Sequence, residues 1–139
     1  MRRGKKGSTK MANLKILIDM KQTRIRIHKS TLRALGNPRW LSLVINPEEC
    51  TLGITPGSPD DKTAHRVSSL VYRTKDSCEL HSAVLIRALL DLNPGWHSRG
   101  KYSITGSMIP EANMVRFDMN TAVFEETDDR EPCSGQTTR

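Results

Sequence analysis

Apolar residues recur at every second position in several short segments of the chain, and this alternation predicts β-strands. The clearest case is a segment in which Ile25 and Ile27 alternate with Arg24, Arg26 and His28. The segments expected to be extended are residues 14–20, 23–28, 41–45, 51–54, 64–72, 77–81, 101–104 and 114–117. The polar residues 46–50 join two of these segments into a predicted β-hairpin.

Start and stop signals predict two helices between these strands. Ser30 or Thr31 offers a hydroxyl N-cap for a short helix that ends at Gly36. Ser82 offers the same kind of cap for a longer helix, which Pro94 ends. The chain is therefore predicted to alternate single helices with pairs of strands.

One four-residue phrase occurs twice and contains both tryptophans. Asn37-Pro38-Arg39-Trp40 returns as Asn93-Pro94-Gly95-Trp96, and matched residues on both sides keep their order. We interpret the chain as two related units, residues 23–56 and 77–119, each with the order strand, helix, strand, strand (βαββ). A single unit would expose unpaired strand edges. We therefore expect an α+β fold in which the duplicated βαββ unit forms a small barrel or paired sheets with short helices.

Charge and apolar content divide the chain into a core and two polar ends. Residues 1–13 combine Lys and Arg with Gly and Ser, which predicts a disordered basic arm, although Met11 offers a second possible start. Residues 14–124 hold the apolar segments and predict a single domain, and residues 125–139 predict a disordered acidic tail. The net charge of +7 arises in the first 40 residues, which hold twelve of the 22 lysines and arginines and a single acid, Asp19.

The compartment follows from features that the sequence lacks. No apolar run approaches the roughly 20 residues that span a bilayer, and the start of the chain has no apolar secretion signal. We therefore expect a cytoplasmic protein that does not contact membranes. Cys50, Cys78 and Cys133 form an odd set without a C-x-x-C pair, which favours reduced thiols over a disulfide or a zinc site.

The sequence lacks the common catalytic patterns: it has no G-x-S-x-G, no H-E-x-x-H and no glycine-rich phosphate loop. We predict no catalytic residue, no cofactor and no metal site, so that the protein is not an enzyme. His28 and His81 end equivalent strands just before a helix, which favours capping or packing over metal binding. Trp40 and Trp96 each follow a helix-ending proline, which favours packing under the helix over a platform on which bases stack.

Basic residues concentrate on one predicted strand and on the helix that follows it. Because strand side chains alternate, Arg24, Arg26 and His28 share one face, and Lys29 and Arg33 come directly afterwards. We expect these five side chains to form a cationic patch that binds the phosphate backbone of nucleic acid. The basic arm would add four contacts, from Arg2, Arg3, Lys5 and Lys6.

The segment from residue 20 to residue 56 resembles the AbrB/MazE/SpoVT family of swapped-hairpin DNA-binding proteins. The matching positions, on a basic strand, a short helix and its Leu-Gly end, are Ile27, Lys29, Arg33, Leu35 and Gly36. His28 stands where the family usually has proline, and the second unit has Ser82 in place of the lysine. MraZ-like proteins carry two such modules in one chain. The resemblance implies duplex DNA as partner, contacted mainly by the first unit, and a homodimer.

Two hypotheses follow. The first is a small DNA-binding protein that regulates transcription through the cationic patch and the basic arm. The alternative is a protein-interaction module of a mobile element, or an inhibitor, that binds a nucleoprotein complex. The sequence specifies neither a target sequence nor a protein partner, and it does not distinguish DNA from RNA.

Overall fold

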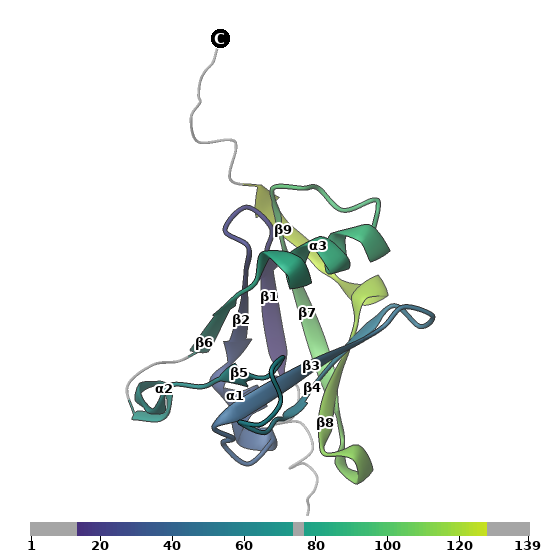
Figure 1. The fold of residues 1–139 in the computed structure, drawn as a ribbon. Coiled ribbons are helices and arrows are strands. Elements are labelled where there is room, and N and C mark those ends of the chain that lie inside the picture. The colour runs from purple at the N-terminus through teal and green to yellow at the C-terminus, as the bar shows by residue number, and fades with distance from the viewer. Residues whose placement is uncertain (1–13, 74–76, 128–139) are drawn as a thin grey trace, which may run out of the picture.

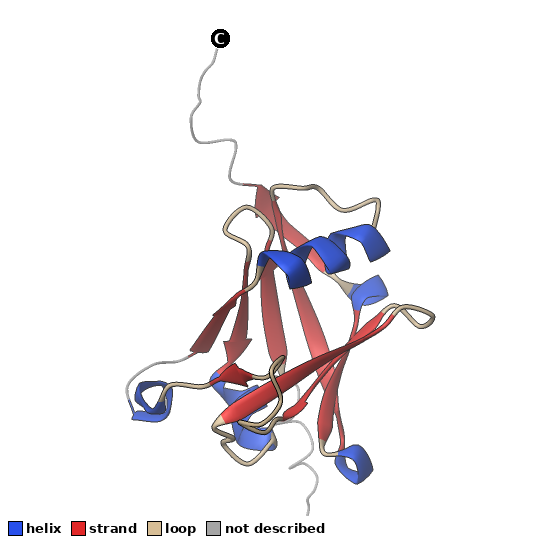
Figure 2. Cartoon of the chain, in the orientation of Figure 1, coloured by secondary structure: helices blue, strands red, loops and turns tan. Residues whose placement is uncertain are grey.

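The structure is a computed structural model that describes residues 14–73 and 77–127. In this part of the chain the fold is mostly antiparallel β, with strands arranged as a nearly closed, barrel-like sheet and three short α-helices (Figures 1 and 2). The strands are β1 (Lys15–Asp19), β2 (Arg24–His28), β3 (Trp40–Asn46), β4 (Thr51–Pro56), β5 (His65–Arg66), β6 (Ser77–His81), β7 (Gly100–Ile109), β8 (Met114–Asp118) and β9 (Val123–Thr127). The helices are α1 (Lys29–Ala34), α2 (Ser69–Arg73) and α3 (Ala83–Leu92).

All strand pairs in the described sheet are antiparallel. The order is β5-β3-β4-β8-β7-β1-β2-β6, and β9 pairs with β7 outside this path. The predicted hairpin is found, since β3 pairs with β4 around the loop at residues 47–50, and β7 pairs with β8 in the same way. The α3 helix covers the upper end of the barrel in Figure 1, whereas α1, α2 and β5 lie toward the lower end.

The long strand β7 forms the corner of the barrel. Its first half pairs with β1 and β9, and its second half, from Gly106 onward, pairs with β8. At Gly106 a Cβ atom would lie 2.6 Å from Cε2 of Phe117, a distance that real side chains do not tolerate. Glycine therefore lets the Phe117 ring pack directly against the backbone where the strand passes from one set of partners to the other.

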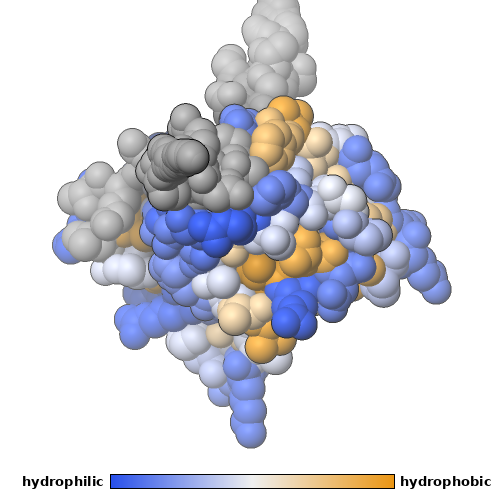
Figure 3. All heavy atoms as spheres, turned by 90° about the horizontal axis from the view of Figure 1, so that it is seen from above, coloured by the Kyte–Doolittle hydropathy of each residue, from blue (hydrophilic) through white to orange (hydrophobic). Residues whose placement is uncertain are grey.

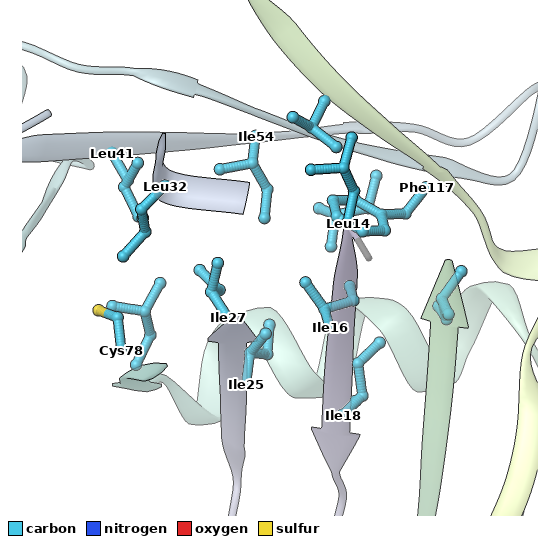
Figure 4. Packing of buried hydrophobic residues seen from close by; sticks show 14 of the residues in the cluster. Leu14, Ile16, Ile18, Ile25, Ile27, Leu32, Leu41, Ile54, Cys78 and Phe117 are labelled. Carbon is cyan, nitrogen blue, oxygen red and sulfur yellow. The ribbon is translucent and has the colours of Figure 1, made fainter. Parts of the chain in front are cut away.

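The alternating residues form the core as predicted. Ile16 and Ile27 are fully buried, and Figure 4 shows them facing Leu32, Leu41 and Ile54 across the interior. The apolar face of each strand thus points inward, and the basic residues that alternate with Ile25 and Ile27 point outward. Burial of these aliphatic side chains is the main stabilising contribution, at about 1.5–3 kcal/mol each.

The helix ends agree with the sequence in one case and differ in the other. Ser82 caps α3 as predicted, because its Oγ accepts a hydrogen bond from the backbone N–H of Leu85 at 3.1 Å. The α1 helix instead begins at Lys29, and the hydroxyl of Thr31 accepts a hydrogen bond from the N–H of Lys15. Thr31 is fully buried and ties α1 to the first strand, so that neither proposed N-cap of α1 is used. Gly36 follows the helix with a φ of +86°, as its predicted stop role requires.

Two boundary predictions are wrong. Residues 64–72 are not one extended segment: β5 has two residues and α2 follows it. Val67 and Val71 are both buried and lie four residues apart, a spacing that also suits one face of a helical turn. The predicted tail from residue 125 begins too early, because β9 continues to Thr127 by pairing with β7. The predicted arm, residues 1–13, and residues 128–139 lie outside the described residues.

Candidate nucleic-acid interface

The predicted strand face exists, and its residues lie where alternation placed them. Arg24, Arg26 and His28 project from the outer face of β2, while Ile25 and Ile27 between them are buried. The neighbouring strands of this face are β1 on one side and β6 on the other. The shared face therefore depends on the antiparallel pairing of β2 with β6, which places Arg26 directly opposite Glu79.

Acidic residues neutralise the two arginines of this face. Arg26 donates to one carboxylate oxygen of Glu79 through Nη2 at 2.7 Å and Nε at 3.1 Å. Arg24 lies between Glu79, 3.5 Å away, and the buried carboxylate of Asp19, 3.2 Å away. The hydrogen bond from Arg26 is the main cause that lowers the pKa of Glu79, and the charges of Arg24, Arg26 and His81 add to it. The expected cationic patch therefore includes two arginines with acidic partners, which the sequence reasoning did not identify.

The outer face continues into a groove of mixed charge. This groove, about 400 Å³ in volume, is lined by Lys15, Arg26, His28, Lys101, Ser103 and Glu125. The hydroxyl of Ser103 donates to the carboxylate of Glu125 at 2.7 Å. Because an acid lies inside the groove and another holds Arg26, its positive potential is reduced.

His28 and His81 end β2 and β6 as expected, but neither is packed. Both side chains are exposed, and His28 makes no side-chain hydrogen bond as the N-cap residue of α1. The predicted capping or packing role is therefore not supported by their contacts. Among the described residues no three His, Cys, Asp or Glu side chains come together as metal ligands.

The remaining predicted residues of α1 belong to a different surface. Lys29 donates from Nζ to the backbone carbonyl of Tyr72 in α2, at 3.2 Å. Arg33 is exposed on α1, and no acidic side chain of the described residues pairs with it. Helix α1 therefore connects the predicted patch to α2 and to the loop that leads into β3.

A second groove lies at this end of the barrel, and sequence reasoning did not identify it. It has a volume of about 510 Å³, and the residues that carry its chemistry are Arg39, Trp40, Arg66, Tyr72 and Arg73. They come from the loop before β3, from the start of β3, from β5 and from α2. None of the described residues that line it is acidic, and none of its three arginines has an ion-pair partner among residues 14–73 and 77–127.

Backbone contacts hold this groove in shape. Trp40 in β3 pairs directly with Arg66 in β5, and the N–H of Val67 donates to the carbonyl of Arg39 at 2.7 Å. The hydroxyl of Tyr72 donates a short hydrogen bond to the carbonyl of Pro38. Burial, with a smaller contribution from the charge of Cys78, raises the pKa of Tyr72, so the hydroxyl stays protonated as a donor.

The two tryptophans lie in different surroundings, which corrects the expectation of matching core positions. The ring of Trp96 packs against the core and stacks on Tyr102, with centroids 4.4 Å apart and planes at 12°. Trp40 is half-buried and lines the groove beside Arg66. Trp96 therefore has the packing role that the sequence favoured. Trp40 instead has the surroundings of the alternative, a platform on which bases stack.

Comparison with known proteins adds no identification: no family model, no curated protein and no solved structure matches this chain. No helix within the described ranges is long and apolar enough to cross a membrane. Arg2, Arg3, Lys5 and Lys6 lie outside the described residues. The candidate interface therefore depends on the geometry of the described arginines alone.

Proposed function

We propose that this protein is a small nucleic-acid-binding regulatory protein, with duplex DNA as the partner that the family resemblance implies. The observation that most directly supports this proposal is a set of basic side chains at the α1 end of the barrel that no described acid neutralises. These residues are Arg33, Arg39, Arg66 and Arg73. Arginine guanidinium groups bind phosphate oxygens in a bidentate manner, which suits a surface that contacts a nucleic-acid backbone.

The first described residues lie at the same end of the barrel as these arginines, which supports the proposal. Leu14, the first described residue, accepts a hydrogen bond from the N–H of Gly106 at 2.7 Å, and Lys15 contacts Thr31 of α1. Leu14 and Lys15 therefore lie next to α1. In this proposal Arg2, Arg3, Lys5 and Lys6 reach phosphates beside those bound by the groove arginines.

We also propose that the fold arose by internal duplication of a βαββ unit. The element order supports this, because β2-α1-β3-β4 and β6-α3-β7-β8 follow the same plan. Exchanging the two units leaves the β2–β6 and β4–β8 pairs unchanged, as a pseudo-twofold axis requires. One chain then supplies both halves of a swapped-hairpin barrel, so that the proposed homodimer would form through another surface. Sedimentation of the full chain tests that homodimer.

A matched pair of variants tests the DNA-binding proposal. Arg66→Ala with Arg73→Ala removes two groove cations, and Lys21→Ala with Arg87→Ala removes two exposed cations near α3. Both variants have the same net charge. Fluorescence anisotropy with a labelled random duplex should show the slope of log affinity against log salt reduced by about 1.8 in the groove variant alone, because each lost phosphate contact accounts for about 0.9. No duplex binding by the wild type at low salt would refute duplex DNA as the partner.

The alternative function, a protein-interaction module that binds a nucleoprotein complex, has an observation of its own. Val84 in α3 is 83% exposed, and Val123 and Phe124 in β9 are more than half exposed. Figure 3, which views the molecule from above, shows hydrophobic areas interrupted by hydrophilic ones on this side. Association with a nucleoprotein complex that survives nuclease treatment and is lost in Val84→Ser with Phe124→Ser would favour this alternative.

A further inference from the structure

The groove between β5, α2 and the loop before β3 combines aromatic and cationic side chains in a way that backbone binding alone does not need. Trp40 and Tyr72 line it together with the buried side chain of Val67, and these form its apolar part. Arg39, Arg66 and Arg73 supply the positive charge. The ligand that matches this combination has a flat apolar ring and negative charges attached to it.

Nucleotides have this chemistry. A volume of about 510 Å³ is within the usual range of small-ligand sites, roughly 300–1,000 Å³. Nucleobases stack on tryptophan and tyrosine rings whatever their sequence, and arginines bind the flanking phosphates. In a regular duplex the base faces are covered by neighbouring pairs. A base can therefore reach Trp40 only when it is unpaired and unstacked.

We infer that this groove binds one unstacked base of a single-stranded nucleic acid, with the base against Trp40 and the neighbouring phosphates on Arg39, Arg66 and Arg73. The inference rests on the proposed function, since it specifies the form of nucleic acid that this end of the barrel recognises. The walls of the groove are held together by the Tyr72–Pro38 hydrogen bond, the Lys29–Tyr72 contact and the β3–β5 pairing. Little ordering cost is therefore expected on binding.

Tryptophan fluorescence gives a direct test, because the chain has two tryptophans and one lies outside the groove. The variant Trp96→Phe keeps Trp40 as the sole reporter, and Trp40→Leu keeps Trp96. Each is titrated with short oligo(dT), with an abasic oligonucleotide of equal length and charge, and with duplex DNA. Short oligo(U) and thymidine monophosphate distinguish RNA and free nucleotide as sources of the same chemistry. Circular dichroism and thermal unfolding verify that each variant is folded.

The expected result is saturable quenching of Trp40 by oligo(dT), with affinity about 10-fold above that for the abasic strand, since stacking of a base contributes about this factor. Trp96 emission should not change, and Trp40→Leu should bind oligo(dT) about 10-fold more weakly. Arg66→Ala with Arg73→Ala should weaken oligo(dT) binding, whereas Lys21→Ala with Arg87→Ala should not.

Two failures are distinguishable. Equal affinity for abasic and base-containing strands, without Trp40 quenching, would overturn the base-binding inference and leave a phosphate-binding surface. Absence of binding to every nucleic acid tested would overturn the proposed function as well. Quenching of Trp40 by an acidic peptide as strongly as by oligo(dT) would also contradict the inference.

Discussion

Two surfaces of this molecule hold several arginines, and they differ in what surrounds those arginines. On the outer face of β2, Arg24 and Arg26 are held by Glu79 and Asp19. At the α1 end of the barrel, Arg66 and Arg73 have no described acidic partner and share a groove with an aromatic ring. Both surfaces are basic in sequence, but only the second retains its charge for a ligand.

The comparison indicates that cross-strand pairing decides whether the arginines of a strand already have an acidic partner. A phosphate approaching Arg26 must compete with a carboxylate 2.7 Å away, which already satisfies the guanidinium and cancels its charge. A phosphate approaching Arg66 meets no ion-paired acid among the described residues. The family resemblance and the alternation identified the first surface, whereas the geometry favours the second.

The largest expected effect is a difference in duplex affinity between variants of the two surfaces. Arg39→Ala, Arg66→Ala and Arg73→Ala combined should weaken duplex binding on the order of 100-fold at low salt, if each contact contributes about 1 kcal/mol. Arg24→Ala with Arg26→Ala should weaken it by less than about 5-fold, because these arginines already have partners. Anisotropy titrations at several salt concentrations measure both. The reverse order would return the interface to the β2 face and contradict the comparison.

Much of the fold, and part of the interface, could be predicted from the sequence. Period-two alternation identified the strands around Ile25 and Ile27, and the Ser82 cap identified α3, because both signals are local. The Arg26–Glu79 pair joins residues 53 positions apart, so it depends on β2 pairing with β6. The alternation indicated a strand at each position and said nothing about which strands become neighbours.

The groove was missed for the same reason. Arg39 and Trp40 stood in the repeated phrase. Arg66 stood in the segment 64–72, which was interpreted as one extended piece, and Arg73 directly followed it. The turn from β5 into α2 brings Arg66 and Arg73 beside Arg39 and Trp40. A helical reading of Val67 and Val71 would have placed Arg66 and Arg73 closer together, and the sequence contained that signal.

Asp19, the buried acid that pairs with Arg24 of β2, should contribute more to stability than to binding. Asp19 is 1% exposed, accepts a hydrogen bond from the N–H of Gln22 and pairs with Arg24, whose Nε is buried without a described acceptor. Asp19→Asn keeps the shape of the side chain but removes the negative charge that balances Arg24. The free energy of unfolding should therefore fall by about 1–3 kcal/mol. Urea unfolding measures this loss. A variant as stable as the wild type would mean that Arg24 is satisfied by other groups.

A smaller effect should come from Glu79, which is the acid shared by both arginines. Glu79→Gln removes its charge, so Arg24 and Arg26 become available to phosphate, and duplex affinity at low salt should rise about 3-fold. Stability should change by less than about 1 kcal/mol, because the Arg26–Glu79 pair is exposed to solvent. Lower affinity in this variant would show that Glu79 positions the arginines for binding, and would contradict the view that it neutralises them.

The smallest predicted effect is a dependence of stability on acid pH that belongs to the β2 face alone. The hydrogen bond from Arg26, followed by the charges of Arg24, Arg26 and His81, lowers the pKa of Glu79 in the folded protein. A carboxylate with a lowered folded pKa stabilises the protein above its ordinary pKa of 4.5, and this contribution disappears as pH falls through the folded value. The difference in unfolding free energy between the wild type and Glu79→Gln should therefore shrink between about pH 5 and pH 3. The groove has no acid among its lining residues, so Arg66→Ala with Arg73→Ala should follow the wild-type pH profile. A difference between wild type and Glu79→Gln that stays constant across this range would mean that the Arg26–Glu79 contact is not maintained in solution.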